Sequence, residues 1–273
     1  MNNHKKENDQ ILQIKNKKHV KAKFDMLEST DNLFIFYAKQ RSGHHGVLDW
    51  MRHKFDNNIH FNDPDLGKSI VDTSTKFWSN DHIFHNKELE NPNPNPRSVF
   101  VNYKNYFFDE KTIENEESMI KKSFFKRPKN IFRVLVLRDY LNNLASSLKN
   151  EHQLKFFTEM WVNHANEFIG NTNYINETLY IVNYNNWFDS NSYRYQIQDQ
   201  FEFDKPETQH FKVSQHGGGS SFDGVKEENP FNMNVLERYK ELSDDVIISF
   251  LKNQELIEFQ KIIFNNLVTH EKL

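Results

Sequence analysis

Four short runs of apolar residues divide the chain and have the length and composition of buried β-strands. They lie at residues 33–38, 98–103, 131–137 and 179–184, and they are rich in Phe, Tyr, Val, Ile and Leu. A strand covered on both faces of a parallel sheet is apolar along its whole length, whereas a half-exposed strand alternates. The four runs therefore predict a central parallel sheet.

Between and after these runs, apolar residues recur at the spacing of amphipathic helices. The predicted helices cover residues 45–55, 111–125, 141–149, 152–169, 232–242 and 244–267. Residues 56–96 are polar, aromatic and irregular, and include the turn-rich sequence NPNPNP. Strands that alternate with helices form parallel βαβ units, which predicts an α/β fold in three layers, α/β/α, with ligands bound at the carboxyl ends of the strands.

The first predicted strand ends in a polar turn, KQRSGHH at residues 39–45, and a helix follows at once. Such a junction gathers free backbone N–H groups and the positive end of a helix dipole around one point. It is therefore suited to bind a phosphate or a sulfate. The turn lacks the GxxxxGK[ST] pattern of nucleotide triphosphatases, so ATP or GTP chemistry is not the expected use.

A second anion site is predicted where the strand at residues 131–137 ends. Arg138 follows that strand directly, and Ser146 lies eight residues further along the next predicted helix. An Arg at the carboxyl end of a strand and a hydroxyl about two helical turns later can converge on one anion. For Arg138 taken alone, the alternative is a surface ion pair at the strand end.

The third motif is the sequence VSQHGGGSSFDG at residues 213–224, where half of the chain's eight glycines are found. A backbone of this kind can approach a ligand closely and offer it many N–H donors. Runs of Gly and Ser also form flexible linkers, which is the alternative reading. The concentration of glycine between a Phe-rich segment and a helical tail favours a ligand-binding loop.

In this order, the three motifs resemble those of sulfotransferases that use 3′-phosphoadenosine 5′-phosphosulfate (PAPS). The Gly loop is similar to that of a microbial and viral branch of the family. The resemblance spans residues 33–224 and implies a P-loop NTPase-like fold. It also implies transfer of a sulfuryl group from PAPS to a hydroxyl of a sugar, a lipid or a small metabolite, leaving the product PAP. Such an in-line displacement requires positive charge on the transferring group and a base for the acceptor proton.

The same resemblance implies roles for individual residues, and it implies no metal ion. Arg41 would stabilise charge on the sulfuryl group and its bridging oxygen. The cofactor site would consist of Arg41, Ser42, Gly43, His44 and His45 at the 5′-phosphosulfate, Arg138 and Ser146 at the 3′-phosphate, and Gly219, Ser220 and Ser221 over it.

The base is the least defined part of this site. The family carries a His or Glu at or just after the end of the second strand, whereas residues 102–105 are NYKN here. Lys104 is expected in the catalytic site, either as the base, if burial lowers its pKa, or as a cation that binds sulfate. His45 at the helix start is a second catalytic candidate. The remaining candidates are Asp109, His60, His82 and His85.

Composition narrows the classes of function. The 273 residues include 35 Lys and Arg against 38 Asp and Glu, and this net charge of −3 argues against a nucleic-acid or membrane-surface protein. There is no cysteine, and no apolar run approaches the ~18 residues of a membrane span. We expect a cytoplasmic protein with one domain at residues 31–273 after a basic segment at 1–30. The abundance of Asn, Lys, Ile and Phe is typical of a viral or microbial AT-rich genome.

Two other functions stay open at this stage. One is a non-catalytic nucleotide-binding protein of the same fold that lost the base, and the other is a P-loop kinase that acts on a small molecule. Two features are interpreted as structural. Residues 156–168 form the buried face of a helix, and Arg238 with Glu241 forms an ion pair on a solvated helix face.

Overall fold

The computed structural model describes residues 26–79, 82–84, 95–149, 156–201, 222 and 233–265; the side chains of 77–79 and 82–84 are outside this description. The chain divides into two compact units. The first unit contains Met1–Ile35, Asp56–Tyr103 and Glu110–Phe132, and the second contains Phe36–Phe55, Lys104–Asp109 and Arg133–Leu273. That residues 31–273 form one domain stays a prediction.

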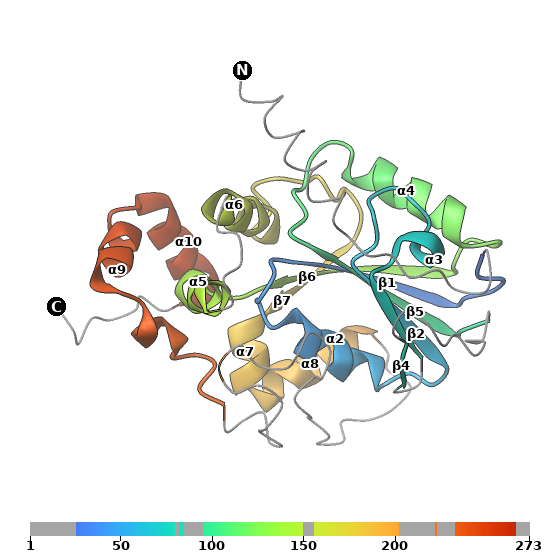
Figure 1. Cartoon of the computed structure of the whole chain (residues 1–273), viewed down its shortest axis with the longest axis horizontal. Helices are drawn as coiled ribbons and strands as arrows, with labels where there is room; N and C mark the ends of the chain where they lie inside the picture. Colours follow the sequence, from blue (N-terminus) through green and yellow to red (C-terminus); the bar gives the residue numbers. More distant parts are fainter. Residues whose placement is uncertain are drawn as a thin grey trace. The chain divides into compact units, whose positions relative to one another are not determined.

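The strands form a seven-stranded sheet in the order β4-β3-β2-β5-β1-β6-β7. Five of them, β2, β5, β1, β6 and β7, make a central parallel sheet flanked by helices, which confirms the predicted fold class (Figure 1). β3 and β4 add an antiparallel edge. The strand bounds are β1 Asn32–Ala38, β2 Asn58–Asn62, β3 Lys76–Ser79, β4 His82–Phe84, β5 Ser98–Lys104, β6 Asn130–Leu137 and β7 Leu179–Asn183.

The first unit corrects the prediction that residues 56–96 are irregular. They contain β2, which pairs in parallel with β5, then the short helix α3 (Ile70–Thr73), β3 and β4. All five residues of β2 are buried, but alternate ones are Asn58, His60 and Asn62, so its apolar content was too low to indicate a strand. Among the described residues, the run at 98–103 is accordingly the fifth strand, β5, and not the second.

His60 lies inside this sheet, where Nε2 is 2.6 Å from Oδ1 of Asn102. It is fully buried, so the structure gives it a structural hydrogen bond in the first unit. Of the other two histidines named as candidate bases, His82 lies in β4 with its side chain outside the description, and His85 is outside the described residues.

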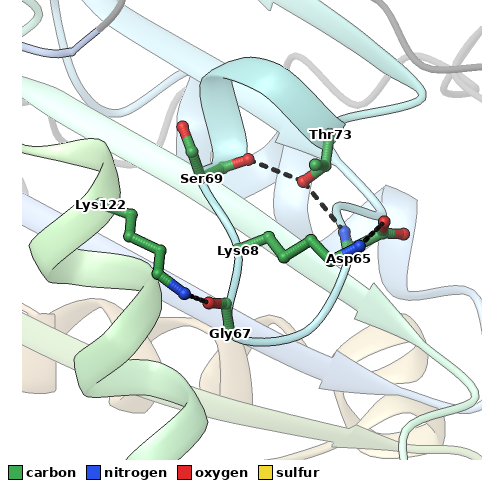
Figure 2. A network of polar contacts seen from close by, with 6 residues as sticks. All are labelled: Asp65, Gly67, Lys68, Ser69, Thr73 and Lys122. Carbon is green, nitrogen blue, oxygen red and sulfur yellow. Dashed lines mark hydrogen bonds and ion pairs between the residues drawn. The ribbon is translucent and has the colours of Figure 1, made fainter.

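Several polar groups in the loop between β2 and α3 form hydrogen bonds or ion pairs with one another (Figure 2). Lys68 Nζ lies 3.2 Å from Asp65 Oδ2, and the Thr73 hydroxyl donates to the carbonyl of Ser69 at 2.7 Å. Lys122, on α4 (Thr112–Ser123), donates to the carbonyl of Gly67 at 2.7 Å. This loop is held by its own contacts and by α4.

The second unit contains the carboxyl ends of β1 and β6, β7, and most of the helices (Figure 1). α2 (His44–Arg52) packs with α7 (Tyr184–Asp189), and α7 packs with α8 (Asn191–Phe201). The other helices are α5 (Tyr140–Leu148), α6 (Phe157–Phe168), the 3-10 helix η2 (Arg238–Glu241), α9 (Asp244–Leu251) and α10 (Gln254–Phe264). Phe157, Met160, Trp161 and His164 form the predicted buried face of α6.

Three helix predictions need correction. Residues 184–201 form α7 and α8, which were not predicted. The helix predicted at 232–242 is the single 3-10 turn η2, with residues 231 and 232 outside the description. The helix predicted at 244–267 is divided, because Asn253 caps a new helix by accepting a hydrogen bond from the Leu256 amide at 3.2 Å. No helix within the described residues is long and apolar enough to cross a membrane.

Candidate active site

The turn after β1 has the backbone conformation of an anion-binding loop. Arg41 has φ 67° and Gly43 has φ 83°, so two of its residues adopt the left-handed region on either side of Ser42. A non-glycine residue there costs roughly 1–2 kcal/mol, and such conformations cluster at functional sites. Alternation between right- and left-handed residues turns successive N–H groups toward one side, and the first N–H groups of α2 lack partners within the helix.

Two carbonyls of this turn accept hydrogen bonds from side chains of the segment that follows β6. Asn143 Nδ2 donates to the Gln40 carbonyl at 2.9 Å, and Arg138 Nη1 lies 3.3 Å from the Arg41 carbonyl. Two residues of the second predicted motif thus fix the first motif. Two N–H groups of the turn are engaged as well, because the Gln40 amide donates to Asn105 Oδ1 at 3.0 Å and the Ser42 amide donates to the Lys39 carbonyl at 3.1 Å. An anion at this turn would therefore depend on the other N–H groups.

Gly43 is required at its position for two reasons. Its φ of 83° is rarely adopted by residues with a side chain, and a Cβ built there would lie 2.2 Å from Cε2 of Tyr184. The Tyr184 ring also faces Arg138, whose Cζ is 5.3 Å from the ring centroid. Tyr184 therefore packs against both predicted anion sites.

His44, and not His45, is the first residue of α2 and is the more buried of the two. Its Nδ1 is 3.4 Å from the Ser42 hydroxyl, and its buried Nε2 has no hydrogen-bond partner among the described residues. Burial lowers the pKa of His44 to about 3, with smaller contributions from the charges of Lys104 and Arg41. A neutral imidazole with one unused nitrogen at a helix N-terminus is placed to contact a ligand.

The structure brings together Arg138 and Ser146, the two residues predicted to share an anion. Arg138 Nη1 is 3.1 Å from Ser146 Oγ, and Arg138 Nη2 donates to the Val235 carbonyl. Arg138 is 2% exposed, which excludes a surface ion pair. Burial lowers the pKa of Arg138, and the neighbouring Tyr184 and Asp139 oppose this shift. The role of Arg138 and Ser146 as phosphate ligands stays a prediction.

Arg238 joins this site, although the sequence interpretation placed it on a solvated face, which is wrong. Arg238 in η2 is buried, and its Nη1 is 3.3 Å from Ser146 Oγ. Two guanidinium groups thus meet at one hydroxyl. No local pattern reveals this, because the contact joins residues that are 92 positions apart.

The predicted Gly loop lies largely outside the description, which includes neither Gly219, Ser220 nor Ser221. Phe222 of the same motif is described. The guanidinium carbon of Arg238 lies 4.7 Å from its ring centroid, and Lys149 Nζ lies 5.3 Å from it. This contact places one residue of the motif beside the Arg138–Ser146–Arg238 cluster.

Lys39 is a further residue that the sequence interpretation did not single out. It follows β1, is buried, and its Nζ donates to Asn105 Oδ1 at 2.9 Å. Burial lowers the pKa of Lys39 to about 8. Lys104, the predicted candidate, ends β5 one position before Asn105 and is half-buried, and Asp109 is exposed. Within the described part of the chain, no group of His, Asp and Glu side chains is arranged to hold a metal ion.

Comparisons with known proteins add little to this geometry. No protein-family model matches the chain, and no curated protein matches it. A solved structure of mouse sulfotransferase SULT7A1 complexed with PAP is similar over 87% of this chain and 86% of that chain, with 12% sequence identity and a TM-score of 0.43. A likeness this weak establishes neither family nor activity, so the functional conclusion below depends on the site itself.

Proposed function

We propose that this protein binds PAPS and transfers its sulfuryl group to an acceptor hydroxyl of a sugar, a lipid or a small metabolite. The observation that carries the proposal is the position of Arg138. Its guanidinium touches both the turn after β1, at the Arg41 carbonyl, and the Ser146 hydroxyl that it shares with Arg238. Two anion sites that meet at one arginine suit a nucleotide that carries acidic groups at both the 3′ and the 5′ position of its ribose.

The arrangement also agrees with the sheet topology. In the strand order, β2, which follows β1 in the chain, lies on one side of the β1–β6 pair, and β7, which follows β6, lies on the other. The carboxyl ends of the adjacent strands β1 and β6 therefore border a topological switch point, where ligands of α/β proteins bind. His44 Nε2 and Arg138 Nε, which have no hydrogen-bond partner in the described part of the chain, would be available to a ligand there.

The residues present fit PAPS in the following way. The turn N–H groups and Arg41 would hold the 5′-phosphosulfate, and Arg138, Ser146 and Arg238 would hold the 3′-phosphate. When bound, PAPS supplies a sulfuryl group whose bond to the bridging oxygen breaks as the acceptor oxygen bonds to sulfur. Arg41 would stabilise the charge that develops on that bridging oxygen.

The experiment that tests this proposal is a thermal-shift comparison of PAP with AMP, ADP and ATP. A ligand at about 100 times its Kd adds roughly 2.7 kcal/mol, or several degrees in Tm. We expect a shift specific to PAP that is lost in Arg138→Ala. Arg194→Ala, which removes another buried arginine that bonds backbone carbonyls, is the matched control and should retain the shift. An equal shift with ATP, or none with PAP, contradicts the proposal.

A second candidate is a nucleotide-binding protein without catalysis. It is favoured by one observation: residues 102–105 contain neither His nor Glu, and Asn102 is engaged by His60. Specific PAP binding with no release of sulfate or transfer from PAPS would support this candidate over the enzyme. Mg²⁺-dependent turnover of ATP would instead support a kinase.

A further inference from the structure

Lys39 is a buried cation in surroundings that do not favour its charge. It is 4% exposed, and its Nζ lies 4.7 Å from the centroid of the Phe157 ring, at the start of α6. Its hydrogen-bond acceptor is the neutral amide oxygen of Asn105, at 2.9 Å. No carboxylate among the described residues pairs with Lys39. A buried ammonium without an anionic partner is costly, and this is why its pKa is lowered to about 8.

Asn105 holds the Lys39 amine at a defined place. The Asn105 amide N–H donates to the Ala38 carbonyl at 3.1 Å, and its Oδ1 also accepts from the Gln40 amide at 3.0 Å. Asn105 Nδ2 donates to Gln40 Oε1 at 3.1 Å. The amine is thus fixed between the turn after β1 and the residues that follow β5. The latter is the region where the sequence resemblance expects a base and where Asn102-Tyr103-Lys104-Asn105 offers neither His nor Glu.

His164, on α6, is the titratable group coupled to Lys39 among the described residues. Its Nε2 lies 2.6 Å from the Tyr106 carbonyl and must donate to it, and its buried Nδ1 has no hydrogen-bond partner among the residues that the structure describes. Burial lowers the pKa of His164 to about 4; the bond to Tyr106 opposes this shift, and Lys39 adds to it. His164 is therefore neutral near pH 8 and supplies no charge that would hold a proton on Lys39.

We propose that Lys39 is the catalytic base, which accepts the proton of the acceptor hydroxyl during sulfuryl transfer. The proposal rests on the proposed function. The acceptor oxygen forms its bond to sulfur, the bond from sulfur to the bridging phosphate oxygen breaks, and PAP leaves with that electron pair. The hydroxyl proton passes to the neutral Lys39 amine, which becomes an ammonium and later releases the proton to water. Arg41 remains charged throughout, so the two basic side chains of one turn have different tasks.

The test uses the full chain with PAPS, and water as the acceptor, so that no natural acceptor is needed. Sulfate release is measured between about pH 6 and about pH 9 in wild type, Lys39→Met and Lys39→Arg. Lys54→Met is the matched control, because Lys54 is also 4% exposed and lies over an aromatic ring, that of Trp50, with Nζ 5.8 Å from its centroid. PAP binding is followed in parallel by thermal shift.

We expect the wild-type rate to rise with pH and to level off above about 8, because the neutral amine is the active form. Lys39→Met and Lys39→Arg should both lower the rate about 10²- to 10⁴-fold and lose the rise with pH, while they keep the PAP shift. Lys54→Met should keep the rate and the rise. Full activity of Lys39→Arg, or an unchanged pH profile in Lys39→Met, overturns the assignment.

The remaining outcomes are also decisive. A wild type that binds PAP but releases no sulfate favours the non-catalytic nucleotide-binding protein and overturns the base together with it. A wild type that does not bind PAP overturns the proposed function as a whole, whereas sulfate release that does not depend on Lys39 overturns the base alone. If both Lys39 variants fail to fold, NMR titration of wild type labelled with ¹³C-lysine replaces them. A set of lysine signals that all titrate near the ordinary value of about 10.4 contradicts the proposal.

Discussion

Two loops of this protein follow parallel strands and lead into helices, yet they differ in whether their lysine has a carboxylate partner. In the loop after β2, Lys68 pairs with Asp65, and Lys122 and Thr73 donate to carbonyls of the loop (Figure 2). In the turn after β1, Lys39 has an amide and an aromatic ring for neighbours, and His44 Nε2 has no partner among the described residues. The first loop thus pairs its exposed cation with a carboxylate, although its buried Ser69 Oγ has no partner among the described residues, whereas the second buries a cation with no carboxylate beside it.

Backbone conformation alone does not separate the two loops, because each places a charged residue and a glycine in the left-handed region. The loop after β2 places its left-handed φ of 63° at Gly67, where a side chain is absent, and Asp63 also adopts this region. The turn after β1 places an arginine there, with φ 67°. Strain at a charged residue that lies beside unused donors is a better indication of a binding site than a glycine or a basic residue alone.

The largest expected effect that separates the two loops comes from Arg41→Ala. We expect turnover of PAPS to fall about 10²- to 10³-fold, because one donor to the transition state is lost. Lys68→Ala, which removes a cation from the other loop, is the control and should leave turnover unchanged. Turnover that is equal in the two variants would remove Arg41 from the mechanism.

Gly43→Ala should have the next largest effect. The left-handed φ and the 2.2 Å contact with Tyr184 together predict a loss of roughly 2–4 kcal/mol in the free energy of unfolding, and loss of the PAP shift. Gly170→Ala is a matched control, because its φ is 78° but nothing lies within 4 Å of the added Cβ. Urea unfolding of the two variants separates the cost of strain from the cost of the Tyr184 contact. Equal losses in the free energy of unfolding would show that the Tyr184 ring moves aside at little cost.

Acid should weaken the fold through its buried histidines. The unfolded chain protonates these imidazoles below the ordinary pKa of 6.5, whereas the folded pKa values are about 3 for His44 and about 4 for His164. Folding therefore excludes protons between pH 6.5 and about 4, and the free energy of unfolding falls as the pH drops, by about 1 kcal/mol per pH unit for each histidine. Urea unfolding at pH 6.5 and pH 5 should show a smaller drop in His44→Gln than in wild type. An equal drop would mean that His44 is protonated in the folded chain.

The smallest effect is expected for Lys68→Met. Lys68 is 58% exposed in its pair with Asp65, so the ion pair contributes at most about 0.5 kcal/mol to the free energy of unfolding. The PAP shift and the Tm should both be unchanged within error. A loss of PAP binding in this variant would contradict the contrast between the two loops.

The sequence alone was enough to predict an element where a single local property, such as apolar composition, marks the whole of it. β1 and β6 were predicted because both are rich in apolar residues, with Arg133 as the one charge in the predicted run of β6. Arg138 and Ser146 were expected to converge on one anion because their spacing of eight residues is a property of one strand end and one helix, and the two side chains are in contact. β2 was missed because its alternate buried residues are polar; one of them, His60, bonds Asn102 of the neighbouring strand β5. A linear pattern does not show that compensation.

Two residues of the site show why the rest was not predictable. Arg238 contacts a hydroxyl 92 positions away, and its own neighbours in sequence suggest an exposed helix. Lys39 was part of the noted turn, but its burial depends on Phe157 and Asn105, which come from later elements. Long-range packing decides whether a basic residue is a solvated charge or a reactive amine, and that packing is not encoded in local spacing.

The two Nη groups of Arg138 are already engaged before any ligand arrives, at the Arg41 carbonyl, the Ser146 hydroxyl and the Val235 carbonyl, and its Nε has no partner among the described residues. A guanidinium has five N–H donors and these are three contacts, so a phosphate that binds here would both exchange partners and add new ones. The affinity of the site is then a difference between two sets of hydrogen bonds. In return, the side chain has already lost its rotational freedom, and binding does not have to supply that entropy. We therefore expect this site to discriminate ligands by the position of their phosphate groups more than by their total charge.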